Sequence, residues 1–191
     1  MGNKSKVLSS GRKYELTALL KIQSSNPLAY DHPRVPFFDD KGIHVEPDIG
    51  MLIGGPWQVW QSGQGPIDAL VEVKSQEGGG SALEKMESTI TRYASLSDRY
   101  EIPCIIVHAF SPGVLSSQHI TYLSEFASAH QVGWISLDTA TAGKITLVAQ
   151  KLMVARKAVR EASQSSMLAL LSTEVLASAL RSRISTAVVM V

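Results

Sequence analysis

The chain has 191 residues, of which 45% are hydrophobic and 18% charged, and its formal net charge at pH 7 is +1. This composition is typical of one globular domain, with or without an appendage, and excludes a disordered or strongly basic chain. The single cysteine, Cys104, excludes a disulfide framework. No apolar run is long enough to span a membrane, and the N-terminal residues lack the apolar core of a signal peptide. We therefore expect a cytoplasmic protein without a membrane segment.

The charges are distributed unevenly along the chain. Residues 1–34 carry a balance of +4, residues 35–143 a balance of −8 and residues 144–191 a balance of +5. An acidic centre between basic ends suits a metal site framed by segments that hold a polyanion. Solvated basic faces at the two ends are the alternative interpretation.

The first half of the chain is expected to form one helix and two strands. Residues 11–22 show the apolar spacing of a helix. The apolar, β-branched runs 48–53 and 68–74, both bounded by Gly and Pro, predict two strands. We expect these strands to pair antiparallel as a hairpin about a turn near residues 60–61.

The second half of the chain alternates helices and strands. The patterns predict, in order, a helix at 82–99, a strand at 103–110, a helix at 116–130 and a strand at 132–138. This order predicts an α/β fold with a mixed central sheet flanked by helices, formed by residues 1–143. Residues 144–191 are expected to form a helical extension of two helices, packed on the core or on a dimer partner.

Three side chains with complementary chemistry are expected to meet at one end of the hairpin. Positions two apart on a strand share a face, so Glu72 and Lys74 point the same way, and antiparallel pairing places Asp48 opposite them. Two adjacent carboxylates repel each other, and a divalent cation such as Mg²⁺ relieves the repulsion. A bound metal lowers the pKa of a water, which a neighbouring lysine can position or help to deprotonate. The pattern predicts metal-assisted phosphodiester hydrolysis; an ion pair on a solvated strand face is the alternative.

The residues Pro47-Asp48 and Glu72-Val73-Lys74 resemble the motif of the PD-(D/E)XK nuclease superfamily. The resemblance covers residues 11–138 as an order of elements, and only the core motif matches in residue identity. It implies a restriction-endonuclease-like core, with Mg²⁺ as cofactor and Mn²⁺ as a substitute. It also implies that Asp48, Glu72 and the backbone carbonyl of Val73 bind the metal and that Lys74 assists the attacking water.

Many members of this superfamily carry a metal-binding glutamate on an early helix. Glu15 is the similar position here; a surface acid favoured by the helix dipole is the alternative.

The function implied by this resemblance is Mg²⁺-dependent cleavage of double-stranded DNA to 5′-phosphate and 3′-hydroxyl ends. A compact chain without motor motifs favours a type II restriction enzyme, acting as a homodimer, with a cognate DNA methyltransferase encoded separately. A repair, phage or homing nuclease of the same fold is the nearest alternative. A non-catalytic nucleic-acid-binding module is the alternative outside the enzymes.

Five residues around the motif are candidates for contacts with DNA. Gln76 follows Lys74 on the same strand face, and Arg92 lies on the next helix. The others are Arg34 in the loop after the first helix and Trp57 and Trp60 between the two strands. In the alternative interpretation the tryptophans cover the hydrophobic core or a dimer interface, and Arg92 lies on a solvated face. His32 is interpreted as an ordinary loop residue.

Overall fold

The computed structural model describes residues 10–33, 35–36, 44–54, 59–60, 66–76 and 81–188 of the chain. In chain order the elements are α1 (Ser10–Gln23), β1 (Tyr30–Asp31), β2 (Val35–Pro36), β3 (His44–Val45), β4 (Ile49–Met51), β5 (Val59–Trp60), β6 (Pro66–Ile67), β7 (Ala69–Gln76), α2 (Ala82–Tyr100), β8 (Cys104–Phe110), α3 (Ser117–Ala129), β9 (Gly133–Ser136) and α4 (Ala142–Val188). The chain divides into two compact units, residues 1–153 and residues 154–191.

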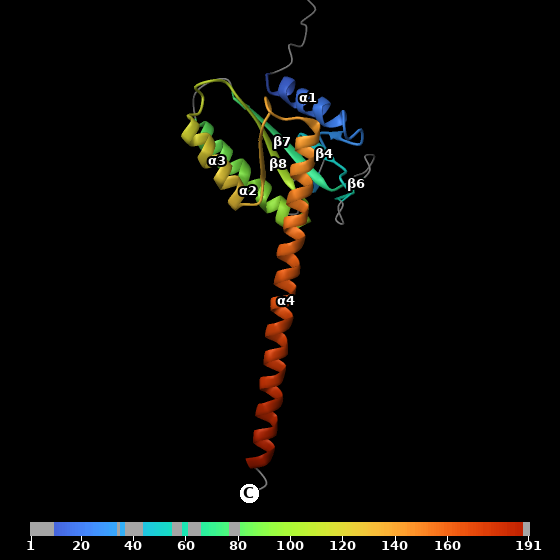
Figure 1. Cartoon of the computed structure of the whole chain (residues 1–191), viewed down its shortest axis with the longest axis vertical. Helices are drawn as coiled ribbons and strands as arrows, with labels where there is room; N and C mark the ends of the chain where they lie inside the picture. Colours follow the sequence, from blue (N-terminus) through green and yellow to red (C-terminus); the bar gives the residue numbers. More distant parts are fainter. Residues whose placement is uncertain are drawn as a thin grey trace, which may run out of the picture. The chain divides into compact units, whose positions relative to one another are not determined.

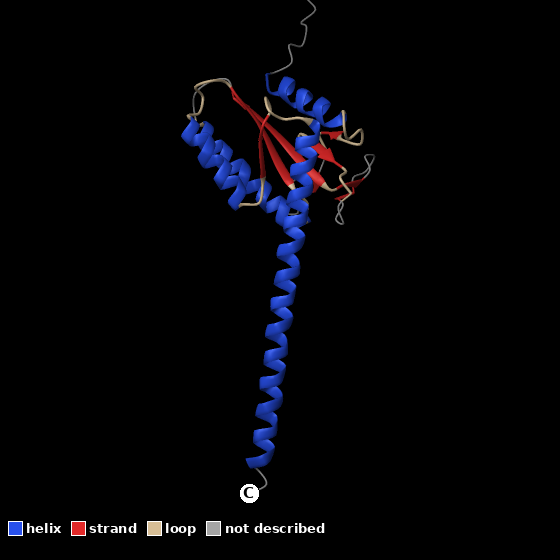
Figure 2. Cartoon of the chain, viewed as in Figure 1, coloured by secondary structure: helices blue, strands red, loops and turns tan. Residues whose placement is uncertain are grey.

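A five-stranded mixed sheet forms the centre of the first unit, in the order β1-β4-β7-β8-β9 (Figure 2). β1, β4 and β7 pair antiparallel, whereas β7, β8 and β9 run parallel. The parallel pairs need crossover connections, and α2 and α3 supply them. The expected α/β class with a mixed central sheet, flanking helices and a C-terminal helical extension is confirmed.

The antiparallel pairing of the two motif-bearing strands is also confirmed. Ile49 lies opposite Val71, and Met51 lies opposite Ala69. The connection between them is more than a simple turn, because β5 and β6 form a separate two-stranded ladder within it. β4 is also shorter than the strand expected at 48–53, since it ends at Met51.

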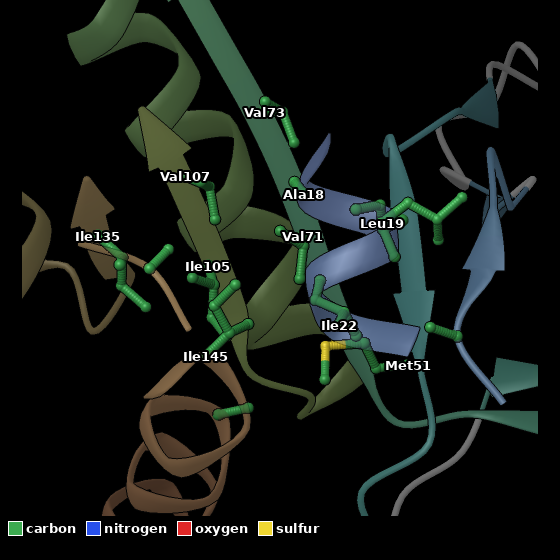
Figure 3. Close-up of a cluster of buried hydrophobic side chains, with 14 of the residues drawn as sticks. Ala18, Leu19, Ile22, Met51, Val71, Val73, Ile105, Val107, Ile135 and Ile145 are labelled. Carbon is green, nitrogen blue, oxygen red and sulfur yellow. The ribbon is translucent and has the colours of Figure 1, made fainter. Parts of the chain in front are cut away.

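Helices cover both faces of the sheet (Figure 1), and each face has its own apolar cluster. On one face, α1 and the start of α4 bury Ile22 and Ile145 against Val71 of β7 and the outer strands (Figure 3). On the other face, α2 and α3 bury Ile90 and Leu123. β8 contributes alternate side chains to both clusters, which explains its continuous apolar sequence. Packing on both faces holds β7 in place, and β7 carries Glu72, Val73 and Lys74 of the motif.

The C-terminal segment forms one helix, α4, so the expectation of two helices was wrong. No Gly or Pro occurs in residues 144–188 to interrupt a helix. The hydroxyl groups of Ser163, Ser165 and Ser166 donate to the carbonyl four residues earlier, so the helix continues through them. Ile145 and Ala149, in the first turns of α4, belong to the core of the first unit.

None of the described helices is long and apolar enough to cross a membrane.

Gly50 of β4 has no room for a side chain. A Cβ atom there would lie 2.7 Å from Cγ2 of Ile67 and 3.0 Å from Cγ of Pro33. Ile67 is buried and β-branched, so it cannot turn away. We expect Gly50→Ala to lower the free energy of unfolding by about 1–3 kcal/mol, measured by urea denaturation.

Gly143→Ala is the control for this prediction, because its Cβ would contact nothing within 4 Å. Alanine should stabilise this helical position by up to about 1 kcal/mol. Equal effects of the two substitutions would contradict the packing argument.

Candidate metal and phosphodiester site

Asp48 and Glu72 are neighbours because of the register between β4 and β7. Ile49 pairs with Val71, so the preceding residue, Asp48, lies opposite Glu72 where β4 begins. The backbone N–H of Val73 donates to Oδ2 of Asp48 at 2.6 Å and fixes this carboxylate against β7. The N–H and C=O of a strand residue point to the same side, so the Val73 carbonyl also faces the Asp48 side of β7. The structure thus brings together the residues expected to meet at this end of the hairpin.

Glu72 is buried and bound by three protein donors. Oε1 is paired with the Lys74 ammonium and lies 3.4 Å from Nη2 of Arg92, and the Tyr93 hydroxyl donates to Oε2. Burial and the Glu72 carboxylate raise the pKa of Tyr93 well above its ordinary value, so this phenol stays a hydrogen-bond donor. The side chain of Glu72 is 5% exposed and that of Lys74 is 30% exposed. Glu72 therefore does not lie on a solvated face, whereas the Lys74 side chain is partly exposed.

A second group of ligand-type atoms surrounds Asp48 on its other side. Glu15 from α1, His32 after β1 and Asp48 each offer one atom, and these atoms all lie within 4.8 Å of one another. Nε2 of His32 is 3.6 Å from Oε2 of Glu15 and 3.8 Å from Oδ1 of Asp48. These separations are longer than hydrogen bonds. Two carboxylate oxygens and an imidazole nitrogen form a donor set suited to a divalent cation.

Charged residues behind this group hold it in place. The Arg12 guanidinium donates to both carboxylate oxygens of Asp31, at 3.0 and 2.5 Å, and also to Oε2 of Glu15 at 3.1 Å. This bidentate pair holds the pKa of Asp31 below its usual range. Oδ1 of Asp31 also lies 2.8 Å from Nδ1 of His32. Arg12 therefore links α1 to the end of β1 and fixes the side chains that face Asp48.

The electrostatics of Asp48 indicate a place for positive charge. Burial and the nearby Glu72 carboxylate together raise the pKa of Asp48 to about 7, with a smaller contribution from Glu15. Near neutral pH, Asp48 therefore carries a proton in a large fraction of molecules. A cation between these carboxylates would replace that proton and relieve their repulsion. The residues present fit the divalent metal that the sequence implies.

The other expected site residues have different outcomes. Glu72, Lys74 and Gln76 share one face of β7, as expected, and Arg92 lies next to Glu72. Arg34 and Trp57 lie outside the described residues. The backbone of Trp60 belongs to β5, but its side chain is also outside the description. Contacts of these five residues with DNA remain predictions.

Sequence reasoning missed His32, Tyr93 and the Arg12–Asp31 pair. Tyr93 is buried in α2, and its hydroxyl group binds Glu72. His32 does follow β1 in a loop, but its backbone N–H donates to the Asp48 backbone carbonyl at 2.9 Å. The signal available was the adjacency of Asp31 and His32, a carboxylate beside an imidazole. That signal is weak until the pairing of β1 with β4 is known.

No protein-family model, curated protein or solved structure matches the chain. The functional argument therefore depends on the geometry of this site.

Proposed function

We propose that this protein is a metal-dependent endonuclease that hydrolyses phosphodiester bonds in double-stranded DNA to 5′-phosphate and 3′-hydroxyl ends. The observation that carries the proposal is the convergence of Asp48, Glu72 and Lys74 at the paired ends of β4 and β7. Glu15 from α1 extends this group of acids. This arrangement is consistent with the PD-(D/E)XK resemblance in the sequence, and we assign the chain to the type II restriction class.

Asp48, Glu72, Glu15 and the Val73 carbonyl are the groups that would hold the metal, with Mg²⁺ or Mn²⁺ as candidates. A bound divalent ion supplies an acidic water and stabilises the charge that develops on a phosphate. Oε1 of Glu72 becomes more accessible to a cation when one of its protein donors moves away. Lys74 is the exchangeable donor, because its side chain is 30% exposed whereas Tyr93 is fully buried.

In this proposal Lys74 orients the attacking water and assists its deprotonation. Its ammonium lies at Oε1 of Glu72 on the same strand face, and its side chain is partly exposed. Released from Glu72, it can hydrogen-bond the attacking water or an oxygen of the scissile phosphate. Tyr93 and Arg92 continue to hold the Glu72 carboxylate while Lys74 acts.

The partners in this proposal follow from the substrate. In this proposal Arg92, half exposed beside Glu72, and Gln76, at the end of β7, would contact double-stranded DNA. A homodimer would present two such sites to the two strands of a symmetric duplex. A restriction role in the cytoplasm would also require a cognate DNA methyltransferase, encoded separately, to protect the host.

Two buried carboxylates side by side, those of Asp48 and Glu72, argue against a purely structural binding module. The proximity of Asp48 and Glu72 destabilises the folded chain at neutral pH, and such strain is typical of functional sites. A module that only bound DNA would gain stability from a neutral residue at position 48.

The test is incubation of the purified protein with plasmid and phage DNA in Mg²⁺, in Mn²⁺ and in EDTA. We expect discrete, metal-dependent fragments whose ends carry 5′-phosphates, and their sequences would reveal the recognition site. A metal-dependent smear would keep the nuclease but replace the restriction class with a repair, phage or homing nuclease. DNA binding without cleavage under every metal condition would overturn the proposal in favour of the binding module.

A further inference from the structure

We propose that Glu15, His32 and Asp48 form a mixed nitrogen–oxygen site that selects a first-row transition ion such as Mn²⁺ over Mg²⁺, with Asp31 and Arg12 as positioning residues. This inference rests on the proposed metal-dependent function and specifies its cofactor. It adds a ligand, His32, that the sequence motif does not contain.

The imidazole of His32 faces the two carboxylates through Nε2. This atom lies 3.6 Å from Oε2 of Glu15 and 3.8 Å from Oδ1 of Asp48, too far for hydrogen bonds. Asp48 is 8% exposed, and the hydrogen bond from Val73 N goes to its other oxygen, Oδ2. Three ligand atoms from α1, the end of β1 and the start of β4 therefore face one another at separations that a shared cation can bridge.

Asp31 fixes the orientation of this imidazole from behind. Its Oδ1 lies 2.8 Å from Nδ1 of His32. Nη1 of Arg12 is 3.0 Å from the same nitrogen, but Arg12 already has acceptors in Asp31 and Glu15. Nδ1–H of His32 can thus donate to Asp31, which leaves the lone pair on Nε2. A carboxylate behind a histidine sets the tautomer and raises the basicity of a metal ligand in this way.

The backbone also holds His32 at the site. Its N–H donates to the Asp48 carbonyl at 2.9 Å, and its φ angle is +45°, in the left-handed region. His, Asn and Asp tolerate this region better than most residues. The backbone of His32 is therefore hydrogen-bonded to the backbone of Asp48, one of the proposed co-ligands.

The chemistry of the donor set determines the preferred ion. Mg²⁺ prefers oxygen ligands and gives up its waters reluctantly. Imidazole nitrogen binds first-row transition ions better, and the affinity of such sites rises from Mn²⁺ towards Cu²⁺. Replacing one oxygen position by the Nε2 of His32 should therefore shift the preference away from Mg²⁺.

The test measures binding of Mn²⁺ alone and Mg²⁺ alone by calorimetry, without DNA. The variants are His32→Asn, which suits the left-handed backbone, Asp31→Asn, and the control His119→Asn at an exposed position. We expect the ratio of the two dissociation constants, Mg²⁺ over Mn²⁺, to fall about tenfold or more in His32→Asn, with a smaller fall in Asp31→Asn. The ratio should be unchanged in the control.

A spectroscopic readout keeps the test independent of cleavage. Pulsed EPR of bound Mn²⁺ should show hyperfine coupling to an imidazole nitrogen in the wild type and in His119→Asn, and this coupling should be lost in His32→Asn. An unchanged affinity ratio together with no nitrogen coupling in the wild type would overturn the inference, even if DNA is cleaved. Nitrogen coupling without cleavage of any DNA would instead uphold this metal site and contradict the nuclease.

Discussion

Replacing Asp48 with asparagine is expected to abolish metal-dependent DNA cleavage and, in EDTA, to stabilise the folded chain. The activity should fall by a factor of about 10³ or more, because the amide cannot supply the charge that binds the cation. At pH 8 in EDTA, the free energy of unfolding should rise by about 1–3 kcal/mol, because the variant no longer places two buried carboxylates side by side. The amide oxygen can still accept the hydrogen bond from Val73.

The stability of the wild type should depend on pH with a defined sign. The pKa of Asp48 is about 7 in the folded chain and near its ordinary value, about 3.9, in the unfolded chain. The folded state therefore holds more protons between these two values. The stability contributed by protonated Asp48 is full below the unfolded pKa and is lost as the pH rises through 7.

Urea denaturation in EDTA at several pH values measures both effects. We expect this decline with pH in the wild type and a shallower decline in Asp48→Asn, with Mn²⁺ restoring stability to the wild type at high pH. Glu125→Gln, at an exposed position on α3, is the matched control and should behave as the wild type. An asparagine variant that is less stable than the wild type at pH 8 in EDTA would contradict the repulsion argument.

Replacing Lys74 with methionine is expected to lower the cleavage rate by about 10² to 10⁴, the range typical of a lost general acid or base. Binding of the metal alone should persist or become tighter, because the ammonium no longer competes for Oε1 of Glu72. Tyr93 and Arg92 still bind the Glu72 carboxylate, so the fold should survive.

The matched control for Lys74→Met is Lys85→Met, which removes an exposed ammonium on α2. Single-turnover cleavage of one duplex, with calorimetric metal titration of the same preparations, separates the two roles. A Lys74 variant that cleaves at the wild-type rate would remove this residue from the chemistry. A variant that no longer binds metal would show that Lys74 supports the site rather than the reaction.

The sequence was sufficient to predict the central hairpin. Apolar, β-branched runs bounded by Gly and Pro predicted both strands, and the two-residue period of a strand put Glu72 and Lys74 on one face of β7. Asp48, Glu72 and Lys74 could therefore be placed together before the structure was known.

The remainder of the site depends on contacts that local patterns do not encode. β1 has only two residues, too few for a period-2 pattern, so the approach of His32 to Asp48 became visible only through the pairing of β1 with β4. The hydroxyl of Tyr93 reaches Glu72 only because α2 packs over β7. In the sequence Arg12 is an ordinary polar residue of the first helix, yet in the structure its guanidinium binds the Asp31 carboxylate at the end of β1.

The prediction of two helices in place of α4 was wrong for a different reason. The apolar residues at 147–159 and at 167–184 favour two helices, because polar residues separate them. The serine hydroxyls of this polar segment bond to carbonyls of the preceding turn in α4, so one helix continues through it.

The most direct measurement is the rate at which the wild type hydrolyses a defined DNA duplex with Mn²⁺, with Mg²⁺ and with EDTA, beside Asp48→Asn, Lys74→Met and Lys85→Met. We expect hydrolysis with either metal, none in EDTA, loss in the Asp48 and Lys74 variants, and the wild-type rate in the Lys85 variant. Cleavage that persists in EDTA, or in both site variants, would contradict the assignment of phosphodiester hydrolysis to this site.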